Sequence, residues 1–245
     1  MTQKLISIGQ IIKTGWQLYS ENINKFIYPI LILILPYIAL FLVGYFEVQP
    51  NVILSISLTA IAIVLNLWLA IFFIELINNI YTKKQADQDN LYEIAFRKIP
   101  SYFVVAVLVG IITILGFILL IIPGVIFAIW YSFAIYINIL EKKDNKGWTA
   151  LKRSKELVKG RWGKTFWRLL IPPLAIYALS MVVVIGLMFM LTGGQVSLEN
   201  PQHALLYNTL STVIILILSP LFTSFYIILY NSLKDTKNTK TETEA

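Results

Sequence analysis

Long apolar stretches alternate with short polar segments along most of the chain. A helix that crosses a hydrocarbon core of roughly 30 Å needs about 20 residues. We predict a transmembrane helix at each of six apolar stretches. They cover residues 26–46, 52–80, 102–122, 124–140, 169–192 and 204–231. The fourth stretch is short and follows the third closely, so a re-entrant hairpin is an alternative there.

Amphipathic segments precede the odd-numbered stretches. In the first of them, apolar residues recur at spacings of three and four, which places them on one helical face. They are Leu5, Ile8, Ile12, Trp16 and Tyr19. We predict interfacial helices over residues 4–22, 91–100 and 147–160, on the cytoplasmic side of the membrane. The tail at 234–245 lacks large apolar residues, so we expect it to be disordered.

The composition agrees with this pattern and excludes several classes of protein. Hydrophobic residues make up 58% of the chain and charged residues 13%, whereas soluble domains have about 45–50% and about 25%. The absence of cysteine excludes disulfides and thiolate metal ligands. We therefore expect an all-α, polytopic bundle of six transmembrane helices that forms a single membrane domain over residues 1–233.

The basic residues predict the orientation of the bundle. With six spans, all 20 Lys and Arg fall on one side, and ten of them lie between the fourth and fifth spans. Basic residues close to a span remain cytoplasmic. We therefore predict a bacterial cytoplasmic membrane protein with both termini in the cytoplasm. A re-entrant fourth stretch would leave those ten charges outside, which favours a full crossing.

The segment from Glu141 to Arg168 carries the densest charge, with ten basic and three acidic residues. Basic side chains beside an anionic inner leaflet attract its headgroups. The candidate residues for binding lipid or a membrane-protein partner are Lys152, Arg153, Lys155, Lys159, Arg161 and Lys164. The alternative is that these charges only fix the topology. Nucleic-acid binding is not expected, because no recognition motif accompanies the charge.

Three polar residues within the predicted spans are candidates for an intramembrane site, namely Asn66, Glu75 and Ser219. Ionisable residues inside spans are often functional. Glu75 lies towards the inner edge of its span, where an ion pair with Arg97 or Arg168 is the simpler interpretation.

Asn66 and Ser219 each allow a structural and a functional interpretation. Asn66 lies in a stripe of small and polar residues of the kind that packs membrane helices together, although a polar cavity is the alternative. Ser219 precedes Pro220, whose ring removes one helical hydrogen bond. The carbonyl of Leu216 then needs a neighbouring hydroxyl or a water molecule as its donor.

Several short motifs between Leu120 and Trp162, among them YSFA at 131–134 and Leu140-Glu141, resemble a known group of proteins. The sequence reads LIIPGVIF from Leu120 to Phe127 and ALKRSKELVKGRW from Ala150 to Trp162. These segments resemble bacterial six-span membrane proteins, including the membrane domain fused to some glycerophosphoryl diester phosphodiesterases. The resemblance covers about a fifth of the chain and implies a fold and a membrane location. Since no soluble catalytic domain is attached, it implies no phosphodiesterase activity.

Residues for catalysis are scarce in this sequence. His203 is the single histidine, and the chain has neither cysteine nor a phosphate-binding loop. We expect no metal, no cofactor and no enzymatic activity. The leading hypothesis is an envelope protein that interacts with lipids, a membrane-protein partner or a second copy of itself. The alternative is a small-solute or lipid transporter or channel, with a path near Asn66 and Ser219.

Overall fold

The computed structural model describes residues 5–45, 52–84, 88–141, 146–197 and 199–243. Within these ranges the chain forms nine helices and no strands. The helices are α1 (Ile8–Glu21), α2 (Ile23–Tyr45), α3 (Val52–Tyr81), α4 (Gln88–Leu119), α5 (Ile121–Tyr131), α6 (Ala134–Leu140), α7 (Trp148–Val158), α8 (Trp162–Leu191) and α9 (Pro201–Thr243).

Six helical segments are long and apolar enough to cross a membrane. They are Ile23–Val43, Val52–Tyr81, Asn90–Leu119, Ile121–Leu140, Trp162–Leu191 and Pro201–Lys237. This result confirms the predicted all-α fold with six apolar helices. The chain is a multi-pass membrane protein.

Some boundaries differ from the sequence-based prediction. The predicted interfacial helix at 91–100 and the span that follows it form one continuous helix, α4, which passes Pro100 without ending. The segment Ile121–Leu140 is divided at Ser132 and Phe133 into α5 and α6. The hydroxyl of Ser154 compensates for this break, because it donates to the carbonyl of Trp130 (2.7 Å) and accepts from the amide of Phe133 (3.2 Å).

The predicted disordered tail is wrong for residues 234–243, which belong to α9. The tail has no large apolar residues, and polar contacts hold its first residues against the rest of the protein. Lys234 lies 3.4 Å from Glu141, and Arg161 donates to the buried side chain of Thr236. A local count of apolar residues could not detect these partners, since they come from distant segments. Residues 244 and 245 lie outside the described part of the chain.

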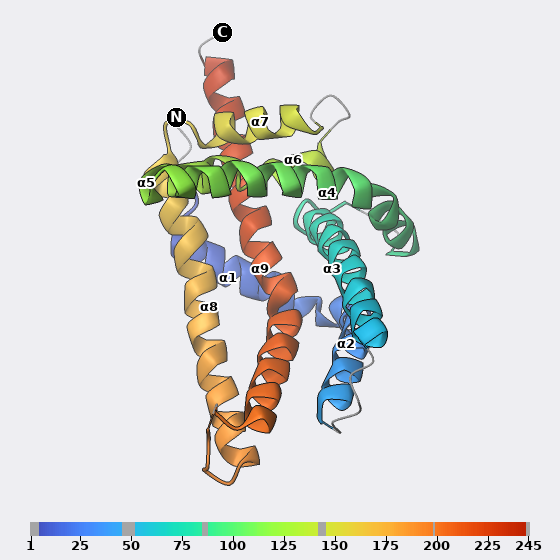
Figure 1. Cartoon of the computed structure of the whole chain (residues 1–245). Coiled ribbons are helices and arrows are strands. Elements are labelled where there is room, and N and C mark those ends of the chain that lie inside the picture. The colour runs from blue at the N-terminus through green and yellow to red at the C-terminus, as the bar shows by residue number, and fades with distance from the viewer. Residues whose placement is uncertain (1–4, 46–51, 85–87, 142–145, 198, 244–245) are drawn as a thin grey trace.

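Two long hairpins and one inclined hairpin form the molecule (Figure 1). α8 and α9 run antiparallel, and α2 and α3 form the second pair. α4 crosses the top of the view, steeply inclined to α8 and α9, and α5 packs against it. The α4–α5 packing is close because Gly124 lacks a side chain, and a Cβ there would lie 2.4 Å from the ring of Phe117.

The tip of the α4–α5 hairpin lies close to the connection between α7 and α8, which the sequence did not predict. Its residues Ile121 and Ile122 line the same groove as Lys159 and Gly160, which join α7 to α8. The charge pattern predicts these two connections on opposite sides of the membrane. In the structure, α5 instead contacts both α7 and α8.

The core is concentrated towards the end of the molecule that carries the basic residues. Most of residues 69–78 of α3 and of residues 220–233 of α9 are buried, together with one face each of α1 and α6. The outer parts of α2, α4 and α8 expose many large apolar side chains. Lipid can cover such surfaces, because hydrocarbon tails are as apolar as the side chains.

Helix α1 is part of this core. A capping box of Ser7 and Gln10 fixes its start. Gly15 allows close contact with α9, since a Cβ at this position would lie 2.5 Å from the ring of Phe225. The backbone of Ile6 also connects to α9 and α8, because its amide donates to Ser232 and its carbonyl accepts from Arg168.

Candidate functional site

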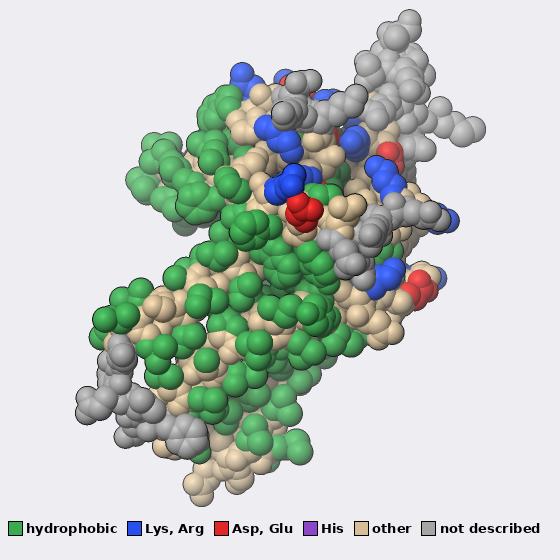
Figure 2. Space-filling view, turned by 90° about the vertical axis from the view of Figure 1, so that its right-hand side faces the viewer, with side chains coloured by type: hydrophobic (Ala, Val, Ile, Leu, Met, Phe, Trp, Pro, Cys, Tyr) green, Lys and Arg blue, Asp and Glu red, His purple; other side chains and the backbone are tan. Residues whose placement is uncertain are grey.

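The predicted basic residues lie on helix α7, on its connection to α8 and on the first turn of α8. The buried face of α7 fixes its position. The residues of that face are Ala150, Leu151, Ser154, Leu157 and Val158. They pack against α4, α5, α6 and α9. The remaining sides of the helix therefore face away from the core. Figure 2 shows Lys and Arg side chains gathered at the upper right of this view, whereas hydrophobic side chains cover much of the lower left.

The four candidate lysines are exposed. Lys152, Lys155 and Lys159 fall on one side of α7 by their spacing of three and four, and Lys164 follows in the first turn of α8. Lys155 is the most closely fixed, because its amino group lies 4.3 Å from the ring centre of Trp130. This geometry is that of a cation–π contact.

The two candidate arginines make ion pairs and hydrogen bonds within the protein. Arg153 lies 3.6 Å from Glu156 and 4.0 Å from Glu141. Arg161 donates to both the hydroxyl and the carbonyl of Thr236 on α9. The six predicted basic residues therefore separate into an exposed lysine face, defined here as Lys152, Lys155, Lys159 and Lys164, and two arginines that connect helices.

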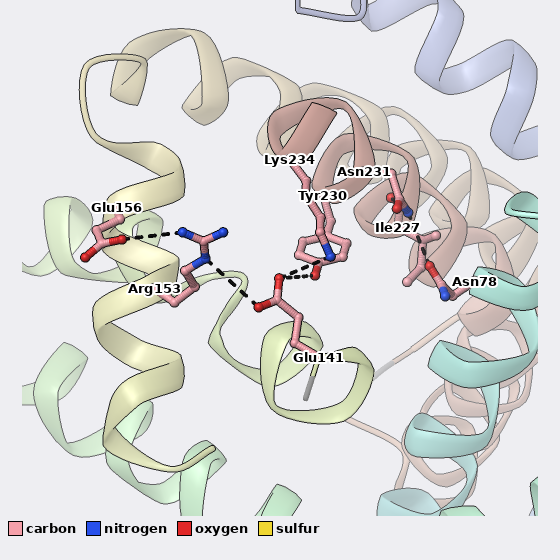
Figure 3. Close-up of polar contacts among 8 residues, drawn as sticks. All are labelled: Asn78, Glu141, Arg153, Glu156, Ile227, Tyr230, Asn231 and Lys234. Carbon is pink, nitrogen blue, oxygen red and sulfur yellow. Dashed lines mark hydrogen bonds and ion pairs between the residues drawn. The ribbon is translucent and has the colours of Figure 1, made fainter. Parts of the chain in front are cut away.

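Glu141 is a structural centre that sequence reasoning missed (Figure 3). Its side chain is 7% exposed and lies at the end of α6. The hydroxyl of Tyr230 donates to its carboxylate at 2.8 Å, and the amino group of Lys234 lies 3.4 Å away. With Arg153 on the other side, this one carboxylate connects α6, α7 and α9.

Figure 3 also shows Asn231 of α9 donating to Asn78 of α3.

Glu75 has a partner, although not one that the sequence suggested. Its carboxylate pairs with Lys98 of α4. The predicted pairing with Arg97 or Arg168 is wrong, because Arg97 pairs with Glu93 and Arg168 donates to backbone carbonyls. One residue along α4 corresponds to about 100° of rotation, so Lys98 faces α3 where Arg97 does not.

Lys146 lies close to the Glu75–Lys98 pair and forms a second polar cluster with it. Its amino group donates to the carbonyl of Asn138, whose side chain also bonds to Ser101 of α4. Partial burial lowers the pKa of Lys146, and the positive charge of Lys98 lowers it further, while Glu75 opposes both effects. The cluster thus joins the loop before α7 to α3, α4 and α6.

The two uncharged intramembrane candidates have satisfied hydrogen bonds. The amide of Asn66 donates to the hydroxyl of Tyr37 and to the carbonyl of Ala62, both at 2.7 Å. The hydroxyl of Ser219 donates to the carbonyl of Leu216 at 2.7 Å. This second contact confirms that a neighbouring hydroxyl compensates for the proline. Both residues therefore stabilise helices and their packing.

Comparison with protein-family models, with curated proteins and with solved structures found no match to this chain. The resemblance to the membrane domain of glycerophosphoryl diester phosphodiesterases remains a prediction. What the protein does must be inferred from its own residues.

Proposed function

We propose that this protein is a non-enzymatic component of the bacterial cytoplasmic membrane that binds anionic phospholipids of the inner leaflet through its lysine face. The observation that carries the proposal is the separation of the basic residues. Lys152, Lys155 and Lys159 point away from the core, while Arg153 and Arg161 hold the helix in place.

The surroundings of the lysine face fit the boundary between headgroups and acyl chains. Trp148 at the start of α7 and Trp167 in α8 are both exposed. Tryptophan is enriched at this depth of a membrane, because its ring is apolar and its N–H is polar. Exposed lysine beside exposed tryptophan is the arrangement expected of an interfacial helix.

The transport alternative requires polar groups that face a path. Asn66 donates to Tyr37 and Ala62, and Ser219 donates to Leu216. Those contacts are the ones expected of helix packing. Lipid binding therefore accounts better for the described residues than transport does.

The proposal is tested by neutralising the lysine face. Lys152, Lys155, Lys159 and Lys164 are replaced by Gln, and phosphatidylglycerol bound to the detergent-purified protein is counted by native mass spectrometry. Each lysine near an anionic surface contributes about 1 kcal/mol, which corresponds to about fivefold in affinity. We expect the quadruple variant to lose most of its preference for phosphatidylglycerol over phosphatidylcholine.

A matched control removes the same charge elsewhere. Lys13, Lys25, Lys83 and Lys84 are also exposed basic residues, but they lie outside α7 and α8. Their replacement by Gln should leave most of the lipid preference intact. An equal loss in both quadruple variants would reduce the effect to net charge, and no loss in either would refute the proposal.

A further inference from the structure

An apolar groove lies between α5 and the connection from α7 to α8, with a volume of about 560 Å³. This size is within the range of about 300–1000 Å³ for sites that bind small molecules. The α5 side of the groove is formed by Ile121, Ile122, Val125, Ile126 and Trp130. Their spacing places them on one face of the helix. The opposite side is formed by Lys159, Gly160 and Trp162.

The groove has cations along one edge and hydrocarbon elsewhere. Lys159 lines it directly, and Lys155 lies over the ring of Trp130, which also lines it. At the other end, Ile121 and Ile122 are among the most exposed apolar residues of the described chain. A ligand that matches this surface is negatively charged at one end and apolar along its length.

Gly160 lines the groove and has a backbone conformation that favours glycine. Its φ of +79° is a conformation that residues with a side chain rarely adopt, and a Cβ built there would meet no atom within 4 Å. Since Trp162 begins α8, the groove lies beside the first turn of a membrane-crossing helix, where acyl chains begin.

We infer that one anionic phospholipid occupies this groove, with an acyl chain along the apolar face of α5 and its phosphate beside Lys155 and Lys159. The inference rests on the proposed function and goes further, because it assigns a single site with a defined chain path. Charge complementarity selects the anionic lipid over a zwitterionic one of the same chain length, since two cations border an otherwise apolar site.

The test is photocrosslinking with phosphatidylglycerol that carries a diazirine in one acyl chain. We expect the label in peptides that contain residues 121–130 and 159–162. Val125→Trp fills the groove and should reduce this labelling at least about fivefold, equivalent to the loss of about one strong contact. Val182→Trp is the control, because Val182 of α8 is 66% exposed and does not line the groove.

A second variant keeps the test decisive if Val125→Trp does not fold. Lys155→Gln with Lys159→Gln changes only exposed side chains, and it should reduce labelling by phosphatidylglycerol to the level seen with the phosphatidylcholine probe. Unchanged labelling in this double variant, or equal labelling by the two probes, would overturn the inference.

The outcome also separates the groove from the lysine face. If Val125→Trp folds and labels like the unmodified protein, while the quadruple lysine variant loses bound phosphatidylglycerol, then the groove is wrong and the proposed function stands. If the quadruple variant retains its phosphatidylglycerol preference, the proposed function fails as well.

Discussion

Glu141 offers a direct test of how α6, α7 and α9 are held together. Its carboxylate accepts a hydrogen bond from Tyr230 and lies near Lys234 and Arg153. The ring of Tyr230 is almost completely buried, at 1% exposure of the residue. Replacing Glu141 therefore affects one buried hydroxyl and two cations at once.

Two substitutions separate these contributions. Glu141→Gln keeps an acceptor for Tyr230 and removes the charge. Since the side chains of Arg153 and Lys234 are 31% and 37% exposed, water still solvates them, and we expect a loss of about 1–2 kcal/mol in the free energy of unfolding. Glu141→Ala also leaves the Tyr230 hydroxyl without its acceptor, for a total of about 2–5 kcal/mol.

The assay is thermal unfolding in detergent, monitored by circular dichroism at one fixed heating rate. For a chain of this size, each kcal/mol lowers the midpoint by about 2–4 °C. Glu156→Gln is the control, because the Glu156 side chain is 57% exposed and its loss should cost less than about 0.5 kcal/mol. If Glu141→Ala unfolds at the same temperature as Glu156→Gln, the assignment of Glu141 as a structural centre is refuted.

Two further predictions concern packing and use the same assay. Gly15→Ala should lower stability by about 1–3 kcal/mol, because its Cβ would lie 2.5 Å from the ring of Phe225. Gly9→Ala in the same helix meets no atom within 4 Å and should raise stability by about 0.5–1 kcal/mol, so equal midpoints would contradict this packing. A double-mutant cycle of Asn66→Ala and Tyr37→Phe should give a coupling of about 0.6 kcal/mol; strictly additive effects would contradict the hydrogen bond between them.

Features that depend on neighbouring residues were predictable from the sequence. The length of an apolar run is a local property. It predicted the segment that became α3 closely, and for α8 it predicted the end but placed the start seven residues too late. The hydroxyl that compensates for Pro220 is also local, since Ser219 and Leu216 lie in one helical turn. A helical wheel of α7 would similarly have separated Lys152 and Lys155 from Arg153.

Features that depend on distant partners were not predictable. Glu141 meets Tyr230 across 89 positions of the chain, and the order in which helices pack in lipid leaves little trace in apolar composition. For the same reason, the sequence did not predict the pairing of Glu75 with Lys98 or the helical conformation of the tail. One weak signal was present, because Glu141 is a single acid directly after an apolar run and before ten basic residues.

The different use of lysine and arginine on α7 has a chemical consequence. Acetylation acts on lysine amines and removes their charge, whereas guanidinium groups stay cationic. Under the proposed function, acetylation of Lys152 or Lys159 would therefore weaken the binding of anionic lipid one charge at a time. The contacts of Arg153 and Arg161 do not involve a lysine amine, so the same modification would leave the packing of α6, α7 and α9 intact.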